Sequence, residues 1–197
     1  MLSDIESFSV PATAVARARR APLVSVIVPA FNCEKYIGDA LASLASQTVS
    51  DIEIIVVDDG STDDTAIVAD EFASRDSRIR VIRREVASGK PAYARNDGLR
   101  VARGEYIALL DADDIATPDR LASSISAMRK TGARFAFADF RKMYQDTGVA
   151  EDNDVLESAN FLERAAQYLT HKGGNVYLCD RSFPAFLLTY IAVNTPT

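Results

Sequence analysis

Short apolar runs, often rich in β-branched residues, recur along the chain, and each is followed by a polar turn and an amphipathic segment. The runs occupy residues 23–29, 52–57, 79–82 and 106–110. An apolar run without alternation, such as 106–110, is typical of a strand buried on both faces of a sheet. Strands that alternate with helices form mostly parallel sheets covered on both faces. The chain is therefore predicted to adopt an α/β fold in three layers, α/β/α, with a mostly parallel, Rossmann-like sheet.

Local signals predict where the elements begin and end. Pro29 cannot donate a ladder hydrogen bond, so the first strand is expected to stop there. Asn32 is expected to cap the first helix, and Ile67 is expected to face inward from the second. Thr117 is expected to cap a later helix, which Gly132 ends. The other expected elements are a strand at 134–140 and helices at 37–47, 65–74, 92–102 and 161–169.

Composition and charge exclude several classes of protein. The 197 residues carry 22 Lys and Arg against 28 Asp and Glu, and a net charge of −6 argues against a nucleic-acid-binding protein. Cys33 and Cys179 lie far apart, which indicates neither a disulfide framework nor a zinc site and fits a reducing compartment. No run reaches about 18 apolar residues, so no membrane span is expected. We expect a cytoplasmic chain, with residues 1–21 as a flexible N-terminal arm and residues 22–197 as one domain.

Acidic residues directly follow two of the apolar runs. Asp111 and Asp113 follow the run at 106–110, and in an extended chain they would project to one face about 6 to 7 Å apart. Two carboxylates at this spacing suit one divalent cation, and all-oxygen ligands select Mg²⁺ or Mn²⁺ over zinc. Asp58 and Asp59 follow an earlier run, where ligand binding and helix capping fit the pattern equally well. Because parallel strands end at one edge of a sheet, a ligand site is expected there.

Signals for other chemistries are few. The chain has neither the glycine fingerprint of dinucleotide-binding folds nor a phosphate-binding P-loop. Arg95 is either a phosphate-binding cation or an ordinary surface residue. The single histidine, His171, is expected in a loop as a surface residue, so a nucleophilic triad has no candidate. One basic cluster is interpreted as a solvated edge, with an anion site or a membrane surface as the alternatives: Arg75, Arg78, Arg80, Arg83 and Arg84.

Four motifs stand out by their order and spacing: VSVIVPAFNCEKY at 24–36, IEIIVVDDGSTDD at 52–64, ARNDG at 94–98 and GEYIALLDADD at 104–114. Together they resemble the nucleotide-binding half of the inverting glycosyltransferases of family 2, which have the A-type glycosyltransferase fold. The resemblance implies a nucleotide-diphosphate-sugar donor, most commonly a UDP-sugar in that family. It also implies transfer of the sugar to an acceptor hydroxyl, of unknown identity, in polysaccharide or glycoconjugate synthesis.

The resemblance implies roles for particular residues. By the family's pattern, Pro29 and Phe31 would line the pocket for the base, and Asp59 would accept a hydrogen bond from the base. Arg95 would lie near the nucleotide, and Asp111 would approach the ribose.

The resemblance also implies a metal ion and a missing part. Asp113 of the Asp-x-Asp motif would bind Mn²⁺ or Mg²⁺ between the two phosphates, offsetting charge on the departing diphosphate. The family's general base lies in the acceptor half, so we assign no catalytic residue and expect the domain to be incomplete at its C-terminal side. The apolar run at 183–193 would then be free for self-association.

Two alternatives from other classes stay open. One is a non-catalytic nucleotide-binding module, since the acceptor half is expected to be absent. The other is a phosphatase of the haloacid-dehalogenase type, in which Asp111 would be phosphorylated, although Ile115 stands where Thr or Val is usual. For location, the inner face of the membrane, through peripheral association, is the alternative to the cytoplasm.

Overall fold

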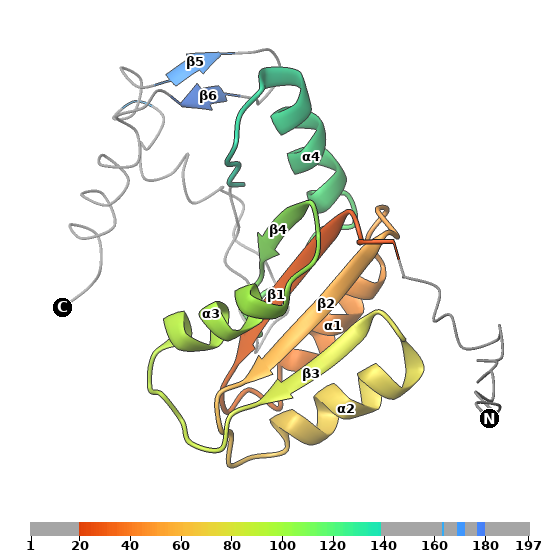
Figure 1. The fold of residues 1–197 in the computed structure, drawn as a ribbon, viewed down its shortest axis with the longest axis vertical. Coiled ribbons are helices and arrows are strands. Elements are labelled where there is room, and N and C mark those ends of the chain that lie inside the picture. The colour runs from red at the N-terminus through yellow and green to blue at the C-terminus, as the bar shows by residue number, and fades with distance from the viewer. Residues whose placement is uncertain (1–19, 139–162, 164–168, 172–176, 180–197) are drawn as a thin grey trace, which may run out of the picture. The chain divides into compact units, whose positions relative to one another are not determined.

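The structure of the protein is a computed structural model that describes residues 20–138, 163, 169–171 and 177–179 (Figure 1). The chain divides into two units, which are described separately. The first contains residues up to 46 and residues 50–116, and the second contains residues 47–49 and those from 117 onward. All six residues for which the family resemblance implies a role lie in the first unit.

A four-stranded parallel sheet forms the centre of the first unit. In spatial order its strands are β3 (Ile79–Arg83), β2 (Ile52–Asp58), β1 (Val24–Ala30) and β4 (Tyr106–Leu109). Every residue of β1 and β2 is buried, as expected for the central strands of a sheet covered on both faces. The predicted α/β class with a mostly parallel sheet is confirmed.

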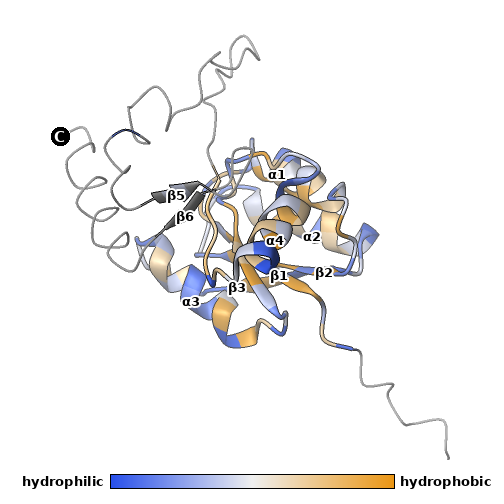
Figure 2. Cartoon of the chain, turned by 90° about the horizontal axis from the view of Figure 1, so that it is seen from above, coloured by the Kyte–Doolittle hydropathy of each residue, from blue (hydrophilic) through white to orange (hydrophobic). Residues whose placement is uncertain are grey.

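Helices cover both faces of this sheet. α1 (Ile37–Ala45) and α2 (Thr65–Arg75) lie on one face, and α3 (Pro91–Val101) lies on the other (Figure 1). Ile55 of β2 packs in a core cluster with Ala94 of α3. Figure 2 shows largely hydrophobic strands between the more polar helices. The three-layer arrangement is therefore present in this unit.

Two glycines allow other segments to approach β1 closely. A Cβ atom on Gly98 of α3 would lie 2.5 Å from Cγ2 of Ile27. A Cβ atom on Gly104, in the turn before β4, would lie 2.4 Å from the main-chain nitrogen of Ser25. Both distances are far shorter than an ordinary van der Waals contact. α3 and this turn can therefore pack on β1 only with glycine at these positions.

A buried polar network joins β1 and β2 near their amino ends. Glu53 accepts hydrogen bonds from Ser25 Oγ at 2.7 Å and from both the main-chain nitrogen and Nη2 of Arg103 at 2.8 Å. Ser25 Oγ also accepts one from the Gly104 nitrogen at 2.8 Å. Burial alone would raise the pKa of Glu53, but the hydrogen bonds from Ser25 and Arg103 outweigh it and lower the pKa below that of a free glutamate. The network fixes the turn that leads into β4.

Replacing Glu53 with glutamine is expected to weaken the fold mainly near neutral pH. Since the folded-state pKa is lowered, the ionised group stabilises the fold above its unfolded pKa of about 4.3, and this contribution is lost as the pH falls through the folded value. We expect Glu53→Gln to lower the free energy of unfolding at neutral pH by about 1 to 3 kcal/mol, and to lessen its decline below about pH 5. Urea titrations at several pH values measure both effects.

The matched control is Glu71→Gln. Glu71 pairs with Arg75 four residues away, and both side chains are largely exposed, so we expect a change within about 0.5 kcal/mol. A Glu53→Gln variant that kept the acid sensitivity of the parent would show that the network does not depend on the charge of Glu53.

β1 extends one residue beyond Pro29, so the predicted end of this strand is wrong. The Ile27 carbonyl accepts from the Leu110 nitrogen on the β4 side, whereas the Ala30 carbonyl accepts from the Asp59 nitrogen on the β2 side. Pro29 therefore points to the β4 side, and pairing of β1 with β4 has already ended there. A proline is tolerated because no described strand needs its missing N–H.

The predicted burial of the fourth strand on both faces is also wrong. Ile107 and Leu109 are 45% and 43% exposed. β4 lies at the edge of the described sheet, and α3 packs mainly on β1 and β2. An apolar run therefore indicated a strand but not its position in the sheet.

Two expectations about the helices of the first unit fail. α1 begins at Ile37, and its N-cap residue, Tyr36, makes no side-chain capping hydrogen bond, so Asn32 is not the cap. Ile67 of α2 is 57% exposed rather than inward. Thr65 and Ala69 are the buried residues of that helix.

The second unit contains α4 (Arg120–Thr131). This helix begins three residues after Thr117, and its N-cap residue, Asp119, makes no side-chain capping hydrogen bond. Gly132 ends the helix in the left-handed conformation, with φ of 70°, as predicted. Residues 134–138 do not form the predicted strand.

Two short strands, β5 (Leu169–His171) and β6 (Tyr177–Cys179), also belong to the second unit and pair in antiparallel fashion. His171 is therefore in a strand rather than a loop. Residues 1–19 of the predicted arm at 1–21, most of the helix at 161–169 and the apolar run at 183–193 lie outside the described residues. Within the described part of the chain, no helix is both long and apolar enough to span a membrane.

Candidate functional site

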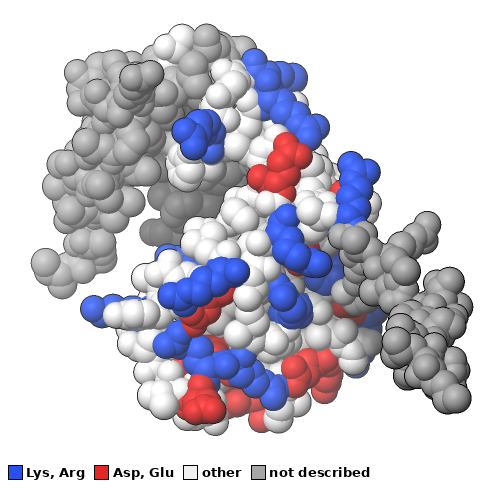
Figure 3. Space-filling model, in the orientation of Figure 1, with Lys and Arg blue, Asp and Glu red and all other residues white. Residues whose placement is uncertain are grey.

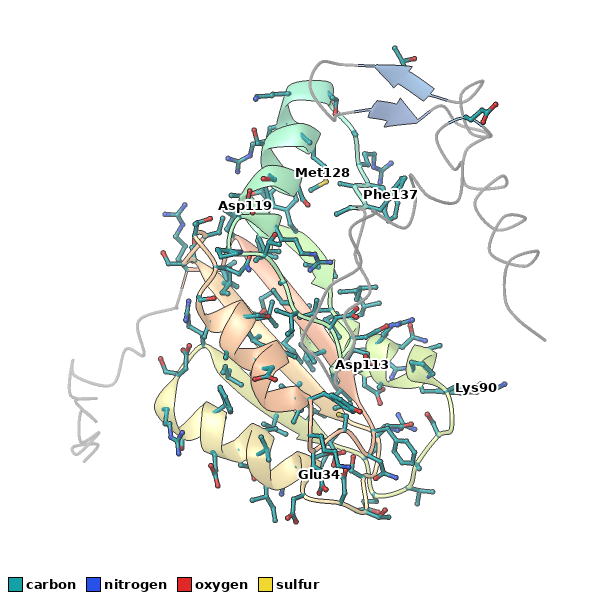
Figure 4. All side chains as sticks on the ribbon, turned by 180° about the vertical axis from the view of Figure 1, so that it is seen from behind. Glu34, Lys90, Asp113, Asp119, Met128 and Phe137 are labelled. Carbon is teal, nitrogen blue, oxygen red and sulfur yellow. The ribbon has the colours of Figure 1, made fainter. Side chains whose placement is uncertain are left out.

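Four loops follow the carboxyl ends of the parallel strands, at residues 31–36, 59–64, 84–90 and 110–116. Figure 4 labels Glu34, Lys90 and Asp113, each from a different one of these loops. Ligands of open α/β sheets bind at this edge.

The first two loops are tied together by Asn32. Its backbone has a φ of 47°, in the left-handed region, which asparagine tolerates better than most residues. Its Oδ1 accepts a hydrogen bond from the Thr62 nitrogen at 2.8 Å, and its own nitrogen donates to Ser61 Oγ at 3.0 Å. The side chain that was expected to cap α1 instead links the loops after β1 and β2.

A second link between these loops uses two carboxylates. The Glu34 nitrogen donates to Asp63 Oδ2 at 3.2 Å, and the Asp64 nitrogen donates to Glu34 Oε2 at 3.0 Å. Asp63 Oδ1 also accepts from the Thr65 nitrogen at 3.0 Å at the start of α2. Partial burial would raise the pKa of Asp63, but the hydrogen bonds from Thr65 and Glu34 lower it. The hydrogen bonds between the two loops fix the loop that carries Phe31, whose side chain is 49% exposed.

Asp59 is buried and bound by the third loop. Its side chain accepts hydrogen bonds from the Ser88 nitrogen at 3.1 Å and from Ser88 Oγ at 2.6 Å. Arg84 Nε lies 2.8 Å from Asp59 Oδ1. Asp58, by contrast, accepts from the nitrogen of Ser61 within its own loop at 3.1 Å. Of the two adjacent acids, Asp59 is therefore the one that joins different loops.

Arg95 and Asp111 are ion-paired with each other. Arg95 Nη2 of α3 lies 2.6 Å from Oδ1 of Asp111, which is in the loop after β4. Arg95 Nε is buried and makes no hydrogen bond with a described residue. The structure thus brings together two residues that the resemblance assigns to the nucleotide.

Asp113 lies in a turn rather than in an extended segment. The Asp114 nitrogen donates to the Asp111 carbonyl at 3.0 Å, so the expected projection of Asp111 and Asp113 to one face of an extended chain is wrong. Among the described residues, no group of three or more His, Cys, Asp or Glu residues forms a metal cage. Asp113 is exposed at the edge of the sheet. A single exposed carboxylate fits Mg²⁺ or Mn²⁺ that is completed by phosphate oxygens and water.

Asp113 also influences the loop after β1. Burial raises the pKa of the Cys33 thiol, and the negative charges of Asp63 and Asp113 raise it further. Asp113 therefore lies within electrostatic range of Cys33 in the loop after β1. A thiol held in this way is a poor nucleophile.

The basic cluster near β3 is neutralised by neighbouring acids. Figure 3 shows basic and acidic side chains interspersed over this face. Each of the five arginines has a carboxylate within 4.0 Å, in the pairs Arg75–Glu71, Arg78–Asp76, Arg80–Glu53, Arg83–Asp70 and Arg84–Asp59. Paired arginines favour the interpretation of a solvated edge over an anion site.

Sequence reasoning missed two residues that contact the predicted site. Arg84 was grouped with the basic cluster, and Ser88 was assigned no role. The usable signal was their position in the loop directly after a predicted strand, beside the edge where the acids gather. Pro29, expected to line a pocket, is buried within β1.

A parallel sheet whose carboxyl edge gathers an exposed aromatic ring, carboxylates and an arginine has the architecture of nucleotide-binding α/β domains. Residues 25–184 match the family described as Glycosyl transferase family 2. The chain belongs to this family.

Known relatives include one bacterial enzyme and two solved structures. Over 118 residues the chain is 40% identical to the UDP-Glc:alpha-D-GlcNAc-diphosphoundecaprenol beta-1,3-glucosyltransferase WfgD of Escherichia coli, a match that covers 60% of this chain and 46% of WfgD. The structure of S. aureus TarS 1-349 in complex with UDP-GlcNAc has 31% identity and a TM-score of 0.53, and the match covers 65% of this chain and 37% of the TarS 1-349 chain.

The mannosyltransferase PcManGT from Pyrobaculum calidifontis, solved in complex with GDP-Man and Mn²⁺, has 30% identity and a TM-score of 0.51. That match covers 56% of this chain and 33% of PcManGT. The A-type glycosyltransferase fold predicted from the sequence is confirmed by these likenesses. The chain spans no more than half the length of the curated bacterial relatives compared with it.

Proposed function

We propose that the chain binds a nucleotide-diphosphate sugar, with a UDP-sugar as first choice, at the carboxyl edge of its parallel sheet. It would be the donor-binding part of a glycosyltransferase that acts in polysaccharide or glycoconjugate synthesis. The observation that carries this proposal is the gathering of Phe31, Asp59, the Arg95–Asp111 pair and Asp113 on three adjacent loops and helix α3 of a family 2 chain.

The base would bind beside the first two loops. Phe31 offers an exposed ring for stacking on a fixed loop, and Asp59 would accept a hydrogen bond from the base. Pro29 is buried beneath this loop, so we propose that it supports the pocket floor.

The ribose and diphosphate would bind between α3 and the loop after β4. Asp111 would accept a hydrogen bond from a ribose hydroxyl, and Arg95 would exchange its partner Asp111 for a phosphate oxygen. Asp113 would hold Mn²⁺ or Mg²⁺ together with the phosphates, and the bound ion would offset the charge on the departing diphosphate. Support for the ion comes from the exposed carboxylate of Asp113 and from the Mn²⁺ that accompanies GDP-Man in the PcManGT complex.

The name of one relative bears on the acceptor and on the location. The name of WfgD describes an acceptor carried on diphosphoundecaprenol, a membrane lipid. An acceptor of that type would place this chain in the cytoplasm, at the inner face of the membrane. A non-catalytic module would bind the donor in the same way but transfer nothing.

Calorimetric titration of the chain with UDP and with GDP, in Mn²⁺ and then in EDTA, tests the proposal. We expect binding of at least one nucleotide to be at least about tenfold tighter with the metal, because the ion neutralises the diphosphate at Asp113. Failure of both nucleotides to bind in Mn²⁺, or equal affinity in EDTA, would contradict the proposal.

A further inference from the structure

Arg84 lies between two carboxylates, those of Asp59 and Asp97, near the place proposed for the nucleotide base. Its Nε is 2.8 Å from Asp59 Oδ1, and its Nη1 pairs with Asp97 Oδ2 of α3. The centre of its guanidinium group lies 5.9 Å from the ring centroid of Tyr93, within the range of a cation–π contact. Its main-chain nitrogen donates to the Asp58 carbonyl at 2.9 Å. Backbone and side chain are thus both fixed.

Asp59 needs a nearby cation because it is only 4% exposed. A buried carboxylate without a counter-charge is costly. Arg84 supplies that charge, yet its Nε makes no hydrogen bond with a described residue, so the close contact with Asp59 is electrostatic. A carboxylate can accept about four hydrogen bonds, and among the described residues only the two Ser88 donors use the Asp59 side chain. Acceptor capacity is therefore left for a ligand.

The loop that carries Ser88 packs tightly on the turn that carries Asp59. Gly60 has a φ of 74°, and a Cβ atom there would lie 2.7 Å from the Ala87 nitrogen. The two backbones are therefore in direct contact, and Asp59 cannot be displaced without moving the loop after β3. Arg84 anchors that loop to α3 through Asp97.

We propose that Arg84 is a positioning residue for base recognition: it holds the Asp59 carboxylate in place to accept a hydrogen bond from the base. This inference rests on the proposed function. A fixed acceptor favours bases with an N–H group on their pairing edge, namely uracil at N3 and guanine at N1. Cytosine and adenine present a nitrogen lone pair at the same place, which a carboxylate repels.

Selectivity between UDP and CDP tests this role, because the two nucleotides have nearly the same size. In Mn²⁺ we expect the parent to bind UDP at least about tenfold more tightly than CDP, the range of a hydrogen bond to a charged group. In Arg84→Gln the ratio should fall to about threefold or less, mainly through weaker UDP binding. GDP and ADP form the second pair if GDP binds more tightly than UDP.

The matched control is Arg83→Gln. Arg83 is adjacent in β3 but pairs with Asp70 of α2, both being about half exposed, so the UDP to CDP ratio should match the parent. If Arg84 had a purely structural role, Arg84→Gln would weaken the binding of UDP and of CDP equally. The ratio of the two affinities would then stay unchanged, and that result would overturn the inference. That result would leave the proposed function intact, whereas failure of the parent to bind UDP and GDP would overturn both.

Asp97→Asn provides a second variant in case Arg84→Gln does not fold. It leaves the Arg84–Asp59 contact but removes the charge that anchors Arg84 to α3. We expect a smaller fall in the ratio than in Arg84→Gln, with a circular-dichroism spectrum like that of the parent. A folded Asp97→Asn variant with the full parental ratio would show that the anchor has no part in base recognition.

Discussion

Replacing Asp113 with alanine should abolish metal-dependent nucleotide binding, with a loss of affinity in Mn²⁺ of about tenfold or more, the same factor that the metal contributes in the parent. Asp113 is the exposed carboxylate that fits the ion, and no cage of other acidic or histidine ligands exists among the described residues to replace it. Removing the ligand leaves the diphosphate without its counter-charge beside other acids. Calorimetry with UDP in Mn²⁺ measures the loss, and electron paramagnetic resonance of Mn²⁺ reports the ion directly.

Asp114→Ala is the control for this experiment. It removes the same charge one residue away, at a carboxylate that we do not assign to the ion. We expect the affinity for UDP to change by no more than about threefold. In EDTA, Asp113→Ala and the parent should bind UDP equally weakly. If Asp113→Ala kept the Mn²⁺ dependence of the parent, the ion would have to bind elsewhere.

Replacing Gly104 with alanine should produce a large loss of stability for the addition of a single methyl group. The new Cβ would lie 2.4 Å from the Ser25 nitrogen and 2.7 Å from the Val24 carbonyl carbon. Both are backbone atoms of the central strand β1, so neither can move aside cheaply, and we expect the free energy of unfolding to fall by about 2 to 4 kcal/mol. Chemical denaturation followed by circular dichroism measures it.

Gly38→Ala supplies the matched control, because it adds the same methyl group in helix α1. There the nearest atoms are the ends of the Phe72 and Val68 side chains, at 3.7 and 3.9 Å. We expect no clash and a gain of about 0.5 to 1 kcal/mol from the better helix propensity of alanine. Equal effects of the two substitutions would mean that the turn before β4 is not packed against β1 as described.

Much of the fold followed from the sequence because β1 and β2 are mostly apolar, each with a single polar residue before its end, Ser25 and Glu53. The same signal failed for β4, since a run such as 106–110 does not reveal whether helices cover the strand on both faces. The start of α1 was wrong for another reason: Asn32 is a good capping residue, but its side chain binds the neighbouring loop instead. Such a choice depends on contacts between distant segments.

The site was predictable as a set of positions but not as a set of contacts. Strand ends placed Asp59, Asp111 and Asp113 on one edge, and the structure agrees. The pairing of Arg95 with Asp111 and the contact of Arg84 with Asp59 could not be read from spacing, because each joins two elements whose approach is set by the packed sheet. The turn at 111–114 likewise replaced an extended segment that spacing alone suggested.

If the proposed function holds, the Arg95–Asp111 pair would make donor binding an exchange of partners rather than the filling of an empty cationic site. An arginine that already faces a carboxylate attracts a stray anion only weakly, since that anion would have to leave Asp111 without a partner. A donor that brings ribose hydroxyls and a phosphate together can satisfy both members at once. The site would thereby discriminate against inorganic phosphate and free carboxylates, which are abundant competitors in a cell, before any contact with the sugar is made.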